Sequence, residues 1–240
     1  MKWESDSVGE EYYSNKSLIG KSKAILPTIQ DRARWYSIPF AKYPDSHFLI
    51  SDRWVSATWI LGNNYKSLSE RGEDDKPFYG SYPPGFLKRV WSMFPDCKSV
   101  VHLFSGSLTK QSGRPPGGGE VLLLDRVQRT KDTILHNAED DFSGLILDGA
   151  DLILADPPYS VEDAEHYGPC LCNKKKVLIH CHTALKTGGY LLWMDQSLPQ
   201  FSKKYWNWCG VITMIRSTNH RVRCVFIFEK VEPKIEESVV

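Results

Sequence analysis

The chain lacks any apolar run that approaches the roughly 18 residues needed to cross a membrane. Its first residues, MKWESDSVGEEYY, contain neither the basic stretch nor the apolar stretch that marks a secretion signal. From these two absences we expect no membrane partner and a cytoplasmic location.

An excess of charge of either sign is also missing. The sequence has 30 Lys plus Arg against 29 Asp plus Glu, a formal charge of +1. Any contact with nucleic acid therefore needs a local basic patch, because the overall charge is too small to indicate a class of partner. With 41% hydrophobic residues, 240 residues suffice for the core of one large domain.

Cysteines are few and scattered, at positions Cys97, Cys170, Cys172, Cys181, Cys209 and Cys224. Without a secretion signal, this spacing predicts reduced thiols and no disulfide framework. A zinc site would have to use the cluster around Cys181, but His180 and His182 point about 200° apart on a helix. We therefore expect no metal and a core position for Cys181.

Short apolar, β-rich runs recur from residue 99 onward. They are SVVHLF (99–104), EVLLLD (120–125), DLILAD (151–156), GYLLWMD (189–195), GVITMI (210–215) and RCVFIFEK (223–230). Unalternating runs suit strands that are buried on both faces. Helices are predicted over 83–94 and 173–189, so strand and helix alternate. This pattern predicts a doubly wound, mostly parallel α/β sheet with ligands at the carboxyl ends of its strands.

The domain organisation follows from a change in composition near residue 80. We expect an N-terminal extension over 1–78, a catalytic domain over 79–230 and a tail over 231–240. The last two apolar runs lie close together and predict an antiparallel hairpin at one edge of the sheet.

The N-terminal extension mixes aromatic rings with guanidinium groups, as a nucleic-acid surface would. The residues are Trp35, Tyr36, Trp54, Trp59 and Tyr65, with Arg32, Arg34 and Arg53. Ordinary packing over the sheet explains the same composition, and both interpretations stay open.

Polar or turn residues follow three of the predicted strands. Ser105, Gly106 and Ser107 make a turn of small residues that lets backbone approach a ligand. Asp125 ends the next strand, where a carboxylate accepts both ribose hydroxyls of a nucleoside, although it would equally cap a helix. Asp156 opens the sequence DPPY, which also suits a plain turn. Because parallel strands end at one edge, the three together predict a nucleoside cofactor site.

LFSGS, Asp125, ADPPY and ALKTGGYLLW together resemble the class I S-adenosylmethionine-dependent methyltransferases. Within that family the chain is most similar to the amino-methyltransferases that modify adenine N6 or cytosine N4 in DNA. The resemblance covers roughly residues 79–230. It implies a Rossmann-like sheet of seven strands, S-adenosyl-L-methionine as cofactor and no metal.

The resemblance also assigns site residues. The catalytic residues it implies are Asp156, Pro157, Pro158 and Tyr159. The cofactor-binding residues it implies are Tyr82, Pro83, Phe104, Ser105, Gly106, Ser107, Asp125 and Asn137. Three positions depart from the family pattern: His102 and Asn137 stand where an acid is usual, and Leu108 stands where a second glycine is usual. These departures concern the affinity for the cofactor more than its identity.

DPPY has a physical interpretation in this family. An exocyclic amine is a poor nucleophile because its lone pair is delocalised into the ring. The Asp156 carboxylate and the Pro157 carbonyl would each accept one amine hydrogen and favour a pyramidal nitrogen. The prolines fix φ and remove competing backbone donors, and Tyr159 offers a face on which an extruded base stacks.

Adenine N6 in DNA is the predicted methyl acceptor. Cytosine-N4 enzymes more often have serine in place of the aspartate, and enzymes that modify a protein amide typically have asparagine there. RNA is not excluded as a partner, and His102 with Leu108 would also suit a catalytically silent nucleic-acid-binding subunit.

For phosphate contact we favour the hairpin loop RSTNHRVR (216–223), with His220 and Arg221 as substrate-binding residues.

Overall fold

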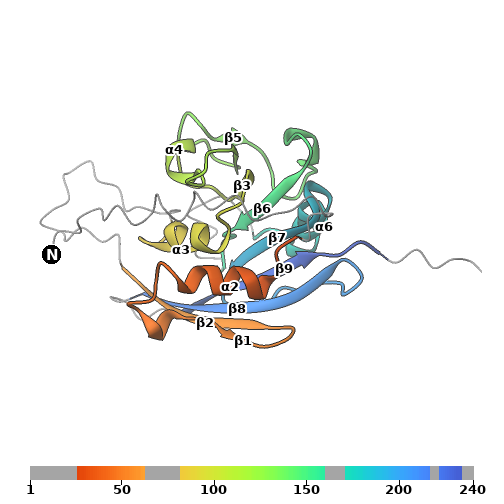
Figure 1. Ribbon diagram of the computed structural model, residues 1–240. Helices are drawn as coiled ribbons and strands as arrows, with labels where there is room; N and C mark the ends of the chain where they lie inside the picture. The colour runs from red at the N-terminus through yellow and green to blue at the C-terminus, as the bar shows by residue number, and fades with distance from the viewer. Residues whose placement is uncertain (1–25, 63–81, 160–170, 217–221, 234–240) are drawn as a thin grey trace, which may run out of the picture.

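The structure, a computed structural model, describes residues 26–62, 82–159, 171–216 and 222–233 (Figure 1). Its strands are β1 (Leu49–Ile50), β2 (Val55–Leu61), β3 (Ser99–Leu103), β4 (Glu120–Asp125), β5 (Ile134–Leu135), β6 (Ala150–Ala155), β7 (Leu185–Asp195), β8 (Trp206–Arg216) and β9 (Val222–Lys230). The helices are α2 (Ile29–Ser37), α3 (Phe86–Met93), α4 (Lys110–Gly113) and α6 (Lys174–Ala184), with 3-10 turns η2 (Pro44–Ser46) and η4 (Ser143–Leu145).

The strands form one nine-stranded sheet in the order β1-β2-β8-β9-β7-β6-β3-β4-β5. The pairs β2/β8, β3/β4, β3/β6, β4/β5 and β6/β7 are parallel, and β9 runs antiparallel to both β7 and β8. The predicted α/β class, the mostly parallel sheet and the antiparallel C-terminal hairpin are confirmed.

The seven strands β3 to β9 match the predicted number, and within the described residues β1 and β2 from the N-terminal region extend the sheet to nine strands. The predicted edge position of the hairpin is wrong. The β8–β9 hairpin is not at an edge, since β2 pairs with β8 along seven residues. If β3 to β7 are numbered 1 to 5, they lie in the order 3-2-1-4-5 that is typical of doubly wound sheets. β9 lies between β7 and β8.

The central strands are buried on both faces, as their unalternating apolar sequences require. Leu152 and Leu154 of β6 belong to one hydrophobic cluster, and Ile153 and Ala155 belong to the other. The first cluster also contains residues of α2 and α3, which lie side by side on one face of the sheet in Figure 1, whereas the second contains residues of α6. The central strands are therefore packed between these two clusters.

Several aromatic residues of the N-terminal region pack into the first cluster. Tyr36 and Trp59 have no exposed surface, and their rings stack at a centroid distance of 5.4 Å. Arg32 is also buried and forms two hydrogen bonds to the Asp96 carboxylate, at 2.7 and 3.2 Å. These contacts are those of core packing. Tyr65 lies outside the described residues.

The two predicted helices are shorter in the structure. α3 begins at Phe86, after Gly85 at the N-cap with φ of 83°, a value that favours glycine. α6 ends at Ala184, because Leu185 is already extended and residues 185–188 continue into β7. In the described part of the chain, no helix is both long enough and apolar enough to span a membrane.

Candidate active site

The carboxyl ends of four adjacent strands form the candidate site. β4, β3, β6 and β7 run in the same direction, so Asp125, Phe104, Asp156 and Asp195 all lie at one edge of the sheet. The backbone N–H of Asp156 points to the carbonyl of Leu103, at 3.5 Å. The DPPY loop and the glycine-bearing turn are therefore immediate neighbours, at the edge where doubly wound sheets bind ligands.

The turn after β3 has an unusual backbone. Phe104 and Gly106 have φ values of 59° and 55°, and a non-glycine residue rarely adopts such a value. The Ser105 N–H donates to the carbonyl of Leu124 at 3.1 Å, which fixes the turn against β4. The Ser105 hydroxyl is buried and has no hydrogen-bond partner among the described residues. A buried polar group of this kind suits a ligand that supplies the missing partner.

The Asp125 carboxylate stabilises this turn through hydrogen bonds to the backbone. Its Oδ2 accepts from the Gly106 N–H at 2.8 Å, and its Oδ1 accepts from the Val127 N–H at 3.0 Å. Each carboxylate oxygen has about two acceptor positions, so both oxygens retain capacity for ribose hydroxyls. The carboxylate thus orders the loop and also fits the predicted ribose contact.

Asn137 follows β5 at the same edge and is held by its neighbours. Its Oδ1 accepts from the Arg126 side chain, at 3.0 and 2.7 Å, and from the Glu139 N–H at 3.2 Å. Glu139 also faces Arg126 at 3.6 Å and Lys176 at 3.9 Å. An acid thus lies two residues beyond the position where the family pattern would have one.

His102 is fully buried on the α3 face of β3 and does not belong to the turn. Its Nε2 lies 3.0 Å from the carbonyl of Gly113, which only accepts, so Nε2 carries the proton. Nδ1 therefore accepts from the Tyr82 hydroxyl at 3.2 Å. Burial lowers the pKa of His102 to about 4, and the Gly113 carbonyl opposes this only in part.

The remaining predicted cofactor residues border the same edge. Tyr82 and Pro83 precede α3, and the Pro83 carbonyl accepts from the Phe86 N–H at 3.0 Å. Burial, and secondarily the charge of Asp156, raises the pKa of Tyr82 well above its usual value. Ser107 is half-buried, and Leu108 after it is a core residue.

The DPPY sequence forms the loop after β6. Pro157 is buried, while Asp156, Pro158 and Tyr159 are half-buried. The Tyr159 hydroxyl donates to Oδ1 of Asp156, and the Arg223 guanidinium lies over the Tyr159 ring, 4.5 Å from its centroid. Burial and the Asp156 carboxylate raise the pKa of Tyr159 well above its usual value.

Sequence reasoning missed Asp195 at the end of β7, although that residue closes an apolar run as Asp125 and Asp156 do. Asp195 is 1% exposed, and its carboxylate pairs with the Lys174 ammonium at 2.6 Å. Its Oδ2 also accepts from the Trp193 indole N–H at 3.1 Å. This ion pair joins the start of α6 to the candidate site.

Some predicted residues lie outside the described part of the chain, namely His220, Arg221 and Cys170. The five described cysteines are unpaired thiols, and Cys181 is buried in the core. No group of three or more His, Cys, Asp or Glu in the described ranges could hold a metal ion.

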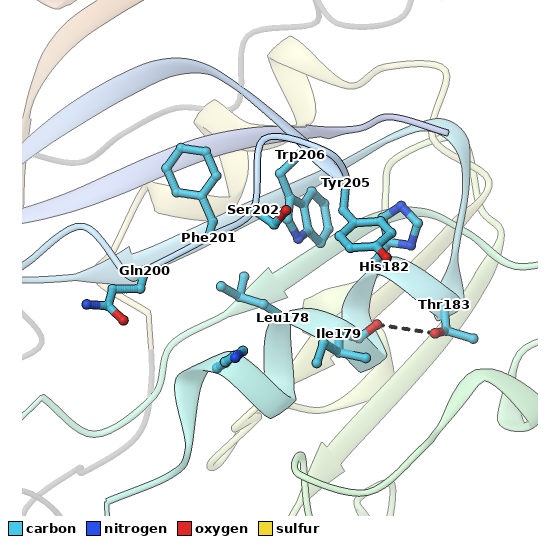
Figure 2. A pocket seen from close by; sticks show the side chains of 10 residues that line it. Leu178, Ile179, His182, Thr183, Gln200, Phe201, Ser202, Tyr205 and Trp206 are labelled. Carbon is cyan, nitrogen blue, oxygen red and sulfur yellow. Dashed lines mark hydrogen bonds between the residues drawn. The ribbon is translucent and has the colours of Figure 1, made fainter. Parts of the chain in front are cut away.

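A cavity of about 580 Å³ lies between α6 and the segment that leads into β8 (Figure 2). Leu178 and Trp206 contribute apolar walls, and the His182 and Tyr205 rings lie 5.2 Å apart between centroids. None of the described residues that line it is a predicted site residue. The cavity is therefore separate from the residues gathered at the strand ends.

No protein-family profile and no curated protein match the chain. Among solved structures it is similar to TrmN from Thermus thermophilus, with 16% identity and a TM-score of 0.44. That match covers 63% of this chain and 50% of TrmN, so the chain spans about half the length of that protein.

Two further solved structures are methylases by their descriptions. A protein of Streptococcus mutans described as a methyltransferase and solved with SAH has 12% identity and a TM-score of 0.36, covering 56% of this chain and 87% of its own. An rRNA methylase from Streptococcus thermophilus has 12% identity and a TM-score of 0.35, and the match covers 56% of this chain and 88% of that methylase. Since the sequence identities and the TM-scores are low, any conclusion about activity rests on the residues of this chain.

Proposed function

We propose that the chain is an S-adenosylmethionine-dependent methyltransferase that acts on N6 of adenine in DNA. The observation that carries this proposal is the backbone contact of 3.5 Å between Asp156 and Leu103. It brings the DPPY loop next to the turn of Phe104 to Ser107, and Asp156 is only half-buried. A carboxylate sealed in the core, or distant from that turn, would not support amine methylation.

The residues at the strand ends fit the cofactor. The Ser105 hydroxyl lacks a partner among the described residues, and Asp125 has acceptor capacity for two ribose hydroxyls. When bound, S-adenosylmethionine would supply a methyl group already activated on a sulfonium. Asn137, Tyr82 and the turn backbone would border the rest of the cofactor.

Asp156 would act on the methyl acceptor. Its carboxylate accepts one hydrogen of the exocyclic amine, and the carbonyl of Pro157 accepts the other. Both acceptors favour a pyramidal nitrogen with its lone pair directed at the methyl carbon. Transfer would form a nitrogen–carbon bond and break a sulfur–carbon bond, with a neutral thioether as leaving group, and the methylated nitrogen would release one proton to solvent. Because the two prolines restrict the loop backbone, positioning would supply much of the rate enhancement.

The hairpin loop between β8 and β9 is the proposed phosphate contact. Cys224, near the start of β9, is the Cα partner of Asp195 at the carboxyl end of β7. The first residues of β9 therefore lie at the same edge of the sheet as the DPPY loop. His220 and Arg221 belong to the hairpin loop, and their contact with phosphates stays a prediction.

The test is incubation of the protein with labelled S-adenosylmethionine and unmethylated DNA, RNA or protein, followed by mass spectrometry of the digested products. We expect labelled N6-methyladenine from DNA. Label in N4-methylcytosine, in RNA or in a protein amide would overturn the assigned acceptor while retaining methyl transfer. Folded protein that neither binds the cofactor nor transfers label would instead favour a catalytically silent nucleic-acid-binding or partner subunit.

A further inference from the structure

Arg223 is brought to the candidate site by β9, far from DPPY in the sequence. Its guanidinium lies 4.5 Å from the centroid of the Tyr159 ring. The next residue, Cys224, is the Cα partner of Asp195, so Arg223 stands at the carboxyl end of β7. The Tyr159 hydroxyl in turn donates to Asp156. A cation, a ring and a carboxylate thus form one continuous array.

This array makes the two faces of the Tyr159 ring unequal. The guanidinium covers one face, where it is attracted by the electron density of the ring. A base can therefore stack only on the opposite face. Because burial and the Asp156 carboxylate raise the pKa of Tyr159, the phenol keeps its proton at neutral pH and remains a donor to Asp156.

We propose that Arg223 is a positioning residue for the base that receives the methyl group, an inference that rests on the proposed function. The ligand it serves is an unstacked purine nucleotide with an exocyclic amine. Arg223 holds the Tyr159 ring from one side, and the base stacks on the other. The amine N–H then replaces the phenol O–H at Oδ1 of Asp156, so only hydrogen bonds are exchanged before methyl transfer.

The chemistry of arginine suits this role better than that of lysine. A guanidinium is planar and stacks on a ring through its whole surface, whereas an ammonium is a strongly hydrated point charge. Lysine at position 223 would keep the charge and lose the stacking. Methionine would keep much of the length and lose both.

The experiment compares Arg223→Met, Arg223→Lys and wild-type protein, each as the full chain. The control is Lys204→Met, which removes a cation 5.8 Å from the Tyr205 ring, away from the strand ends. Binding of single-stranded oligo(dA) is measured by fluorescence anisotropy, and kcat and KM are measured on the DNA that the wild type methylates. Thermal unfolding of every variant is recorded, and Arg223→Gln replaces the methionine variant if that variant is unfolded.

We expect Arg223→Met to raise Kd and KM about 2- to 30-fold with little change in kcat, since a cation–π contact has that magnitude. Arg223→Lys should fall between Arg223→Met and the wild type, and Lys204→Met should match the wild type. Unchanged Kd in folded Arg223→Met, or equal losses in the methionine and lysine variants, would overturn the role of Arg223. If the wild type transfers no methyl group but oligo(dA) binding still depends on Arg223, the proposed function fails and only a role of Arg223 in binding a base remains.

Discussion

The Tyr82 hydroxyl donates to Nδ1 of His102 across 3.2 Å, and Nε2 of the same ring donates to the Gly113 carbonyl. His102 therefore acts within the packing between α3 and β3. The resemblance to amino-methyltransferases placed this residue where an acid is usual. Its side chain serves instead to connect the segment before α3, the strand β3 and the end of α4.

Removing the Tyr82 hydroxyl should destabilise the protein. Tyr82→Phe leaves Nδ1 of the fully buried His102 without this donor, which costs about 1–3 kcal/mol. Urea denaturation at pH 7 measures the change in the free energy of unfolding. Tyr43→Phe is the matched control, because Tyr43 is 36% exposed and should change that free energy by less than about 0.5 kcal/mol. Equal stability of the two variants would contradict the assigned hydrogen bond.

His102 should also make stability depend on pH. Burial lowers its pKa to about 4, whereas an unfolded chain has a histidine pKa of about 6.5. The unfolded state therefore binds more protons, so the contribution of His102 is fully present above pH 6.5 and is lost as pH falls to about 4. The loss amounts to about 3 kcal/mol.

His102→Gln tests this pH dependence, because glutamine does not titrate and retains both a donor and an acceptor. Urea denaturation at several values between pH 7 and pH 4.5 gives the slope for each protein. We expect a shallower slope in the variant. The same slope in both proteins would show that other groups cause the acid sensitivity.

Asp125→Ala should weaken binding of S-adenosylmethionine about 10- to 100-fold, the effect expected for hydrogen bonds to a charged group. Isothermal titration calorimetry measures the dissociation constant. Asp132→Ala is the control, because Asp132 likewise accepts a backbone N–H, from Lys110 at 2.9 Å, in a neighbouring loop. An unchanged dissociation constant in folded Asp125→Ala would show that Asp125 only stabilises the loop and does not bind the cofactor.

The ion pair of Lys174 and Asp195 should contribute more to stability than that of Lys186 and Asp151. Asp195 is 1% exposed, so Lys174→Met leaves a buried carboxylate without its cation, at a cost of about 1–3 kcal/mol after allowance for the partly exposed lysine. The Lys186 pair has a similar distance of 2.7 Å but is more exposed, and Lys186→Met should cost less than about 1 kcal/mol. Denaturation that ranks the two variants in the opposite order would contradict this assignment.

Much of the central sheet could be predicted from the sequence because its strands are continuous apolar runs. The run 120–125 coincides with β4, since its neighbours on both sides are polar or glycine. The strand β2 was missed, although Val55, Ala57, Trp59 and Leu61 alternate with more exposed residues. Its period of two is that of a strand with one face in the core, a pattern different from the continuous apolar runs of the central strands.

The strand-end residues were also foreseeable, because the carboxyl ends of parallel strands share an edge. Arg223 was not, because its contact with Tyr159 depends on how β9 is registered against β7. Nor was the Tyr82–His102 bond, which depends on how α3 packs on the sheet. Local sequence contains neither the register nor the packing angle.

The account depends most directly on Asp156, and one comparison tests it. Cofactor affinity by calorimetry and methyl transfer to DNA are measured for the wild type, Asp156→Ala and Asp132→Ala. We predict that Asp156→Ala binds S-adenosylmethionine like the wild type and loses at least about 100-fold in kcat, because an essential acceptor for the amine is gone. Asp132→Ala should retain its activity. Methyl transfer at the wild-type rate by Asp156→Ala would contradict the proposed role of the DPPY loop.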